Sequence, residues 1–259
     1  MSPKRIIIVG ASSGIGYELA KLYIESGWEV GIAARRTEPL ELLKQMSPAH
    51  VFISAIDVTT DLASVALQDL IDLMKGVDVY VHVAGIGYQN PDLEIEVELA
   101  TIDTNAQGFT RLVDTAYQHM AQNGGGHIAI ISSIAGTRGL GLAPAYSATK
   151  KFQNTYIEAL AQLSSMQSHG ISFTDIRPGF VDTPLLAGDY RYPMLLKAPQ
   201  VARSIKKAIS KRKRVKIIDW KYRILNFFWQ LIPHGLWQKL SIGRLKGNAP
   251  SEQEDKPNA

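Results

Sequence analysis

The feature that most constrains the fold is a regular alternation between short runs of β-branched residues and longer stretches with helical periodicity. This alternation is the sequence pattern of βαβ units, in which helices join parallel strands. Several of the short runs are apolar almost throughout, as expected for strands covered by helices on both faces. We predict seven strands, at residues 5–9, 29–34, 51–56, 77–84, 127–132, 171–176 and 215–219.

The intervening stretches predict six helices, at residues 14–26, 39–46, 62–74, 95–123, 145–168 and 199–211. Right-handed crossovers would wind these elements into a Rossmann-type α/β fold, a doubly wound seven-stranded parallel sheet with helices on both faces. No linker or repeat divides the chain, so we expect one domain over residues 1–247 and a disordered tail over 248–259. The chain has no cysteine, which excludes disulfides, thiol nucleophiles and thiolate metal sites, and no metal site is predicted.

The first predicted strand leads into a glycine-rich turn that opens a helix. Glycines at this spacing allow a tight turn and close approach of the backbone to a pyrophosphate, while the helix N-terminus supplies unpaired N–H groups. An ordinary glycine turn is the alternative, but the position between a strand and a helix favours dinucleotide binding. The predicted contacts are Gly10, Ser12, Ser13, Gly14, Ile15 and Gly16.

Two arginines follow the second predicted strand, in Ala33-Ala34-Arg35-Arg36. An NAD-binding site usually places an acid here, about 20 residues beyond the glycines, to hold the ribose 2′-hydroxyl. No acid is present, and Arg35 and Arg36 would instead bind a 2′-phosphate through charge-assisted hydrogen bonds. The pair therefore favours NADP(H) over NAD(H), the alternative being a solvated basic pair at a helix start.

A third pattern is Tyr146-Ser147-Ala148-Thr149-Lys150, within a predicted helix. A spacing of four residues places Tyr146 and Lys150 on one helix face, where the ammonium would stabilise a phenolate and lower the pKa of the tyrosine. Such a tyrosine could donate a proton near neutral pH. Alone the pattern is weak, because any two surface residues can fall at that spacing.

Further motifs stand at fixed places along the chain. Asp57-Val58 follows the third predicted strand, Asn105 lies in the fourth helix, Ser133 precedes Tyr146 by 13 residues, and Arg177-Pro178-Gly179-Phe180-Val181-Asp182-Thr183 follows the sixth strand. With the glycine turn and the Tyr146–Lys150 pair, these motifs resemble those of the short-chain dehydrogenases/reductases over about residues 5–209. One departure is His82-Val83-Ala84-Gly85, where that family usually has Asn-Asn-Ala-Gly. We expect His82 to be a locally satisfied strand residue rather than an acid or base.

The resemblance implies an oxidoreductase that interconverts a carbonyl compound and an alcohol. Tyr146 would donate a proton to the carbonyl oxygen as NADPH delivers hydride, and Ser133 would bind the same oxygen. Lys150 would bind the nicotinamide ribose, and Asn105 would hold a water that relays protons. The implied cofactor contacts are Asp57, Val58, Ala84, Gly85, Tyr146, Lys150, Pro178, Gly179, Val181 and Thr183.

Residues 184–198 would form the substrate lid, and their apolar and aromatic side chains favour a hydrophobic small molecule. Two other functions stay open. One is a cofactor-binding regulatory protein, which would be expected to lose the tyrosine or the lysine. The other is an enzyme at a membrane surface that acts on lipid-derived ketones. The resemblance also implies a homodimer or homotetramer, paired through residues 95–123 and 145–168.

Positive charge is concentrated near the C-terminus. Residues 203–246 hold 13 Lys and Arg residues against the single acid Asp219, and aromatic residues crowd the same segment. We predict a helical extension over residues 217–246, divided at Pro233, that forms a flap over the substrate or a subunit contact rather than a membrane-surface helix. A weak membrane contact through residues 211–240 stays open. No nucleic-acid module surrounds the basic cluster and no window could span a membrane, so we expect a cytoplasmic protein without nucleic-acid partners.

Overall fold

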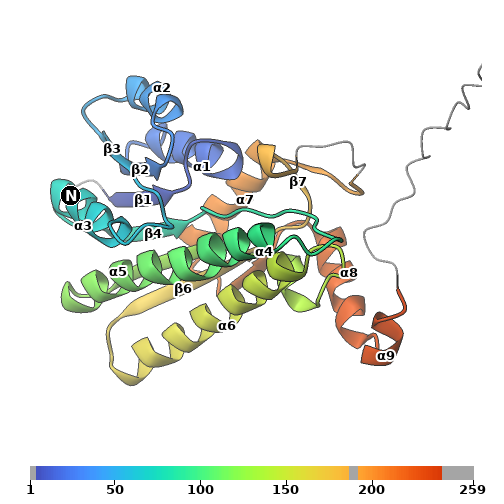
Figure 1. The fold of residues 1–259 in the computed structure, drawn as a ribbon. Coiled ribbons are helices and arrows are strands. Elements are labelled where there is room, and N and C mark those ends of the chain that lie inside the picture. Colours follow the sequence, from blue (N-terminus) through green and yellow to red (C-terminus); the bar gives the residue numbers. More distant parts are fainter. Residues whose placement is uncertain (1–3, 187–191, 241–259) are drawn as a thin grey trace, which may run out of the picture.

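The computed structural model describes residues 4–186 and 192–240, and its centre is one seven-stranded parallel sheet (Figure 1). The strands lie in the order β3-β2-β1-β4-β5-β6-β9. The order runs outward from β1 in one direction and resumes beside it with β4, so the switch point of the doubly wound sheet lies between β1 and β4. The bounds are β1 (Arg5–Val9), β2 (Glu29–Ala34), β3 (Val51–Ala55), β4 (Val79–His82), β5 (Gly126–Ile131), β6 (Ile171–Arg177) and β9 (Val215–Ile217).

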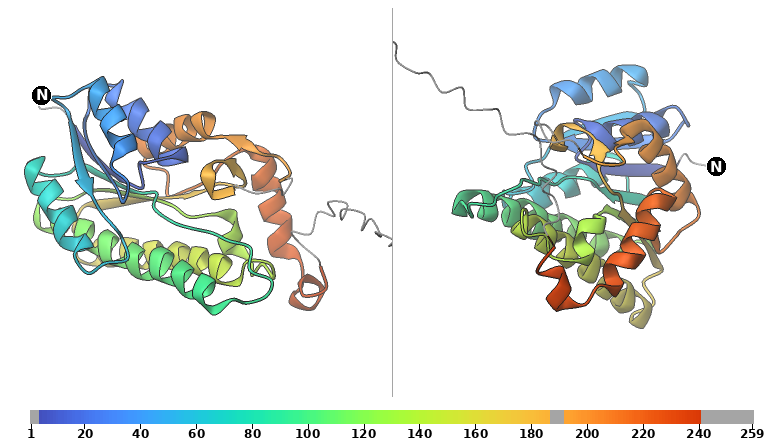
Figure 2. Two further views of the ribbon diagram at one scale, coloured as in Figure 1. Left: turned by 45° about the horizontal axis from the view of Figure 1, so that its top comes forward. Right: turned by 90° about the vertical axis from the view of Figure 1, so that its right-hand side faces the viewer.

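Helices cover both faces of the sheet, as predicted (Figures 1 and 2). The first layer consists of α1 (Gly14–Ile24), α2 (Glu38–Met46) and α7 (Ala198–Ser210). The second layer consists of α3 (Ala63–Leu73), α4 (Ile95–Ile102), α5 (Phe109–Gln122) and α6 (Pro144–Met166). Because successive strand residues point to opposite faces, Ile6 and Ile8 of β1 pack under the first layer and Ile7 and Val9 under the second.

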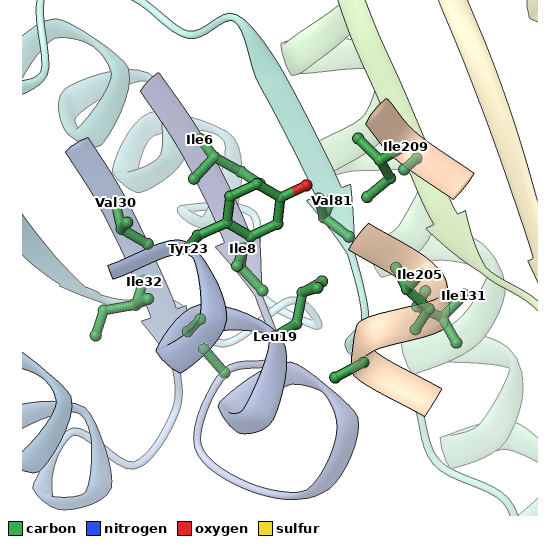
Figure 3. Packing of buried hydrophobic residues seen from close by; sticks show 14 of the residues in the cluster. Ile6, Ile8, Leu19, Tyr23, Val30, Ile32, Val81, Ile131, Ile205 and Ile209 are labelled. Carbon is green, nitrogen blue, oxygen red and sulfur yellow. The ribbon is translucent and has the colours of Figure 1, made fainter. Parts of the chain in front are cut away.

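The first of these two cores is drawn in Figure 3, where side chains of α1 and α7 lie over the strands. Leu19 and Tyr23 of α1 and Ile205 of α7 are fully or almost fully buried. Burial of an aliphatic or aromatic side chain of this size contributes about 1.5–3 kcal/mol. The two cores hold the carboxyl ends of the strands in register, and these ends carry the predicted site.

The helix predicted over residues 95–123 is interrupted. A π-helical turn, Asp103–Gly108, joins α4 to α5, and it contains Asn105. Gly108 packs so closely on β3's following loop that an added Cβ would lie 2.6 Å from the Val58 carbonyl oxygen. The π-helical turn thus lies where the chain makes a tight tertiary contact. The sequence pattern of residues 95–123 does not reveal that contact, so it could not predict the turn. Single π-turns inside α-helices are frequent at functional sites.

Other differences from the predicted bounds are small. The strand predicted over 77–84 is β4, Val79–His82, because the N–H groups of Val83 and Ala84 both donate to the Val9 carbonyl (2.8 and 3.0 Å) and the chain leaves the sheet. A second, two-stranded sheet pairs β7 (Val181–Asp182) with β8 (Leu196–Lys197), and it was not predicted.

The described part of the predicted C-terminal extension, up to residue 240, contains two short helices, α8 (Trp220–Leu231) and α9 (His234–Trp237), which Pro233 separates. They lie at one end of the molecule, beyond the helical layers (Figure 2). The tail predicted to be disordered, 248–259, lies outside the described residues. Among the helices of the described ranges, none combines the length and the apolar composition that crossing a membrane requires.

Candidate active site

The glycine-rich turn between β1 and α1 folds against the end of β4. Gly10 has φ +93°, and a Cβ there would lie 2.5 Å from the Ala84 amide nitrogen, so only glycine fits this position. Ser13 is the N-cap of α1, but its side chain caps no backbone N–H group in the structure. The first N–H groups of α1 therefore stand at the rim of the turn, where an anion could accept from them.

A pocket of about 880 Å³ opens beside this turn, at the carboxyl ends of the strands and around the β1–β4 switch point. Its walls contain nearly every residue that the sequence predicts for catalysis or cofactor binding. Those that line it are Gly10, Ser12, Ser13, Gly14, Ile15, Arg35, Arg36, Asp57, Val58, Ala84, Gly85, Ser133, Tyr146, Lys150, Pro178, Gly179, Val181 and Thr183. Two predicted residues, Gly16 and Asn105, lie behind the wall and do not line the pocket.

Two hydroxyl groups meet at the centre of this wall. Ser133 follows β5 and is the N-cap of a 3-10 helix, where its Oγ accepts from the Ala135 N–H (3.1 Å). Tyr146 is in the first turn of α6, and its hydroxyl is hydrogen-bonded to Ser133. Burial raises the pKa of Tyr146, and the hydrogen bond to Ser133 lowers it only in part. The expectation of a lowered pKa is thus wrong: the phenol is protonated at neutral pH.

Lys150 lies one helical turn beyond Tyr146 and is almost fully buried. Its Nζ donates to the Ile131 carbonyl oxygen and to Gln153 Oε1, both at 3.0 Å, and lies 5.8 Å from the Tyr146 ring centroid. Burial lowers the pKa of Lys150 to about 8, against an opposing effect of the Asp175 carboxylate. The ammonium therefore titrates near the physiological range instead of far above it.

Gln153 is a site residue that the sequence reasoning missed. It is buried, and besides accepting from Lys150 it donates through Nε2 to the backbone carbonyl of Asn105 (2.9 Å) in the π-helical turn. The backbone carbonyl of Asn105 thus has a side-chain donor. A sequence signal for this role was available: Gln153 is an amide three residues after Lys150, on the same face of the predicted helix.

The side chain of Asn105 does not line the pocket but forms hydrogen bonds with the loop after β4 and with α6. Its Oδ1 accepts from the Ile86 N–H (2.9 Å), and its Nδ2 donates to the Ile86 carbonyl (2.7 Å) and to Thr149 Oγ1 (3.2 Å). These bonds tie the loop after β4 to α6. Asn105 therefore positions the backbone of Gly85 and Ile86, which line the pocket.

His82 is a buried strand residue, as predicted, but it is only partly satisfied: its Nε2 has no hydrogen-bond partner among the described residues. Its Nδ1 is 2.9 Å from the Tyr80 hydroxyl, and the ring packs edge-on against Phe109. Burial, with a further contribution from the Lys150 charge, lowers the pKa of His82 to about 3. The imidazole is neutral at physiological pH, and it is absent from the pocket wall.

The end of β2 forms one end of the pocket. Arg35 is exposed and Arg36 is solvent-accessible, and no acid stands at that strand end. Asp57 lies opposite, after β3. Burial tends to raise its pKa, but hydrogen bonds from Thr59 and the charge of Arg35 outweigh this effect and lower it.

The opposite end of the pocket is apolar. It is walled by Leu140, Leu142, Leu185, Leu186, Met194, Leu225 and Trp229, the last two from α8. Part of the predicted lid, residues 187–191, lies outside the described residues. The described part is tied to α8 by Tyr222, whose hydroxyl accepts from the Phe180 N–H (3.1 Å) and donates toward the carbonyls of Pro193 (3.0 Å) and Met194 (3.1 Å).

Comparison with known proteins agrees with this geometry. The family model for short chain dehydrogenases matches residues 4–191. An uncharacterized oxidoreductase of Myxococcus xanthus is 28% identical over 244 residues, which is 92% of this chain and 96% of the relative. A dehydrogenase/reductase SDR family member 7B of Bos taurus is 27% identical, over 95% of this chain and 83% of the relative.

Solved structures have the same fold. The 3-ketoacyl-(acyl-carrier-protein) reductase of Brucella melitensis, complexed with NADH, superimposes with a TM-score of 0.74 and 25% identity, over 83% of this chain and 96% of that one. A short-chain dehydrogenase of Streptomyces avermitilis superimposes with a TM-score of 0.76 at 24% identity, over 93% and 98% of the two chains. The family match, the parallel sheet and the constellation around Tyr146 lead to one conclusion: the chain belongs to the short-chain dehydrogenase/reductase family.

Proposed function

We propose that this protein is an NADP(H)-dependent oxidoreductase that interconverts a carbonyl group and an alcohol on a hydrophobic small molecule. The observation that carries the proposal is the convergence of Tyr146, Ser133 and Lys150 on one wall of the large pocket. Two hydroxyls hydrogen-bonded to each other, with a buried cation next to them, can bind and protonate an oxygen on which negative charge develops.

The residues present fit a dinucleotide. The glycine turn brings backbone within reach of a pyrophosphate, and the uncapped start of α1 offers N–H donors to it. At the adenosine end, Arg35 and Arg36 favour a 2′-phosphate, and no carboxylate stands at the end of β2 to accept from a 2′-hydroxyl. The related reductase of Brucella melitensis is complexed with NADH, so the phosphate preference rests on these two arginines.

In the direction of reduction, a bound nicotinamide would supply hydride to the carbonyl carbon. The Tyr146 hydroxyl donates its proton to the carbonyl oxygen, and the Ser133 hydroxyl donates a hydrogen bond to the same oxygen. Because burial keeps the phenol protonated at neutral pH, Tyr146 holds the proton that this step needs. Lys150 stabilises the phenolate that is left, and Gln153 and the Ile131 carbonyl hold its ammonium in place.

The substrate class follows from the opposite end of the pocket. Leucines, a methionine and Trp229 form that wall, while the polar groups lie at the Tyr146 end. A pocket of this kind favours a mainly apolar molecule with one carbonyl or hydroxyl group.

We also propose that the protein pairs with a second copy through the second helical layer. Exposed apolar side chains on α4 and α6, namely Leu99, Ile102, Phe152 and Leu163, support such a contact. Light scattering on the purified protein would test it: a monomer at micromolar concentration contradicts the proposal.

Fluorescence titration with NADPH and NADH tests the cofactor assignment. We expect tighter binding of NADPH by the native protein and loss of this preference in the Arg35→Ala/Arg36→Ala variant. A carbonyl-substrate screen follows, with Tyr146→Phe as the matched control. This variant should bind NADPH as the native protein does and show no turnover. Retention of most of the kcat would refute the role of Tyr146. Binding of neither nucleotide would refute the assignment as a nicotinamide-dependent enzyme.

A further inference from the structure

The outward face of α8 is an unusual surface, because five large apolar side chains lie on it in one stripe. Trp220, Ile224, Phe227, Phe228 and Leu231 follow one another at helical spacing, and between 48% and 62% of each is exposed. We call this stripe the α8 outer face. Isolated exposed apolar residues are ordinary, but a contiguous aromatic stripe marks a surface that contacts something else.

The opposite side of α8 packs against the rest of the protein. Tyr222 and Asn226 are buried, and Leu225 and Trp229 line the pocket. The helix is held in this orientation by the Tyr222 hydrogen bonds, by Asp219, which caps its first turn, and by Arg138, which donates to the Gln230 carbonyl (3.0 Å). Rotating α8 to bury its outer face against the protein would break these contacts. The outer face is therefore exposed in the orientation that the rest of the protein imposes on α8.

A basic cluster lies next to the α8 outer face. Lys207, Lys211, Lys213 and Lys216 surround a small hollow at the β9 edge of the sheet. Lys216 has a lowered pKa, first because of burial and then because of the positive charges of Lys213, Arg223 and Lys207. Arg223 belongs to α8, so the cluster continues onto the helix that carries the stripe. The only acid among the described residues from 203 onward is Asp219.

We propose that the α8 outer face and this basic cluster together dock the protein on the surface of a lipid bilayer that contains anionic lipids. Aromatic and aliphatic side chains on one face of a helix, with Lys and Arg beside them, are suited to the boundary between headgroups and acyl chains. Each basic residue close to an anionic bilayer surface contributes to binding, and the lysine cluster has few acids of its own to neutralise it.

Charge also argues against a second copy as the occupant. A two-fold contact places each surface patch opposite the same patch of its partner or close to it, which would bring the two basic clusters together. Like charges at such a contact repel, whereas phosphate groups of anionic lipids neutralise them. The apolar side chains on α4 and α6 already offer a face without this cluster for pairing.

Docking by α8 would place the apolar end of the pocket next to the bilayer, because the same helix forms its wall. This consequence rests on the proposed function, while docking itself does not. A membrane-dissolved carbonyl compound could then enter past Leu225 and Trp229.

Co-sedimentation with lipid vesicles tests the proposal without any cofactor or substrate. The full chain should sediment with vesicles of phosphatidylcholine and phosphatidylglycerol, and much less with phosphatidylcholine alone or at high salt. Phe227→Ser/Phe228→Ser should weaken binding about tenfold or more. The matched control is Leu62→Ser/Val65→Ser at the start of α3, two apolar side chains that are also exposed, and it should bind as the native protein does. Lys213→Gln/Lys216→Gln should weaken binding and reduce its salt dependence.

Circular dichroism and the thermal midpoint verify that each variant is folded. Absence of sedimentation, equal binding to both kinds of vesicle, or equal effects of the α8 and α3 variants would overturn the proposal. So would light scattering in which the native protein is an oligomer and Phe227→Ser/Phe228→Ser is a monomer, because a second copy would then cover the stripe. Activity on carbonyl compounds is measured separately, so a failure of the proposed function leaves this result unaffected.

Discussion

Replacing Gln153 by leucine should change the pH dependence of the reaction more than its maximum rate. The leucine is close in size to glutamine, but it removes the acceptor of one Lys150 hydrogen bond and the donor to the Asn105 carbonyl. Lys150 and Asn105 are both almost fully buried, so water cannot readily replace the two lost hydrogen bonds. The Ile131 carbonyl would remain as an acceptor for the ammonium.

The magnitude follows from the charge on Lys150. A hydrogen bond to a charged group contributes about 1.5–3 kcal/mol, and about 1.4 kcal/mol of selective loss from the charged form lowers a pKa by about one unit. The pKa of Lys150 would fall from about 8 to about 7 in the variant. At pH 7.5 the protonated fraction would then fall from roughly three quarters to roughly one quarter. We expect a threefold loss of kcat/KM at that pH, with recovery near pH 6.

The assay is the pH profile of kcat/KM for carbonyl reduction, whose alkaline limb should move down by about one unit. Gln153→Glu is the matched control with the opposite sign, because a carboxylate beside Lys150 stabilises the ammonium and should move the limb up. Both variants lose the donor to Asn105, so both should be less stable by about 1–3 kcal/mol in denaturant titrations. Lower stability with an unmoved limb in both variants would refute the reasoning and leave Gln153 a purely structural residue.

Three further changes are expected from the described contacts. Tyr222→Phe removes the hydroxyl that joins α8 to the residues around the pocket, so KM should rise about fivefold, or about 1 kcal/mol, with kcat nearly unchanged in steady-state assays. Leu19→Ala opens a cavity between α1 and the sheet, and urea unfolding should show a loss of about 2–5 kcal/mol. Burial, with a smaller effect of Arg212, lowers the pKa of His127 to about 4, below its unfolded value of 6.5, so the unfolded chain binds the proton first and stability falls as pH drops from 6.5 to 4. The loss is about 3 kcal/mol, and His127→Gln should flatten this part of the stability–pH curve.

The seven parallel strands and the helical layers on both faces of the sheet could be predicted from the sequence because the signals are local. Runs such as Ile6-Ile7-Ile8-Val9 are apolar on both faces, and the glycine turn follows the first of them directly. The motif spacings likewise placed Ser133, Tyr146 and Lys150 on one pocket wall. These features depend on neighbours in sequence or on the regular winding of βαβ units.

What the sequence did not predict depends on contacts between distant segments. The π-helical turn forms where Gly108 meets the loop after β3, and nothing within residues 95–123 marks it. The pKa of Tyr146 follows burial more than the nearby ammonium, because Lys150 directs its hydrogen bonds to Ile131 and Gln153. Likewise, the spacing of Asn105 gave no sign that its side chain would face the Ile86 backbone instead of the pocket.

Tyr222 links α8 both to ligand binding in the pocket and to binding at the α8 outer face. Its hydroxyl contacts the backbone before β7 and the residues before β8, while its helix carries both a pocket wall and the exposed stripe. If a ligand in the pocket favours one position of α8, whatever binds the outer face in that position must bind more tightly by the same factor, and the reverse must also hold. The change in affinity at the outer face on filling the pocket would therefore give the coupling free energy, and the same value would apply to the affinity of the pocket ligand.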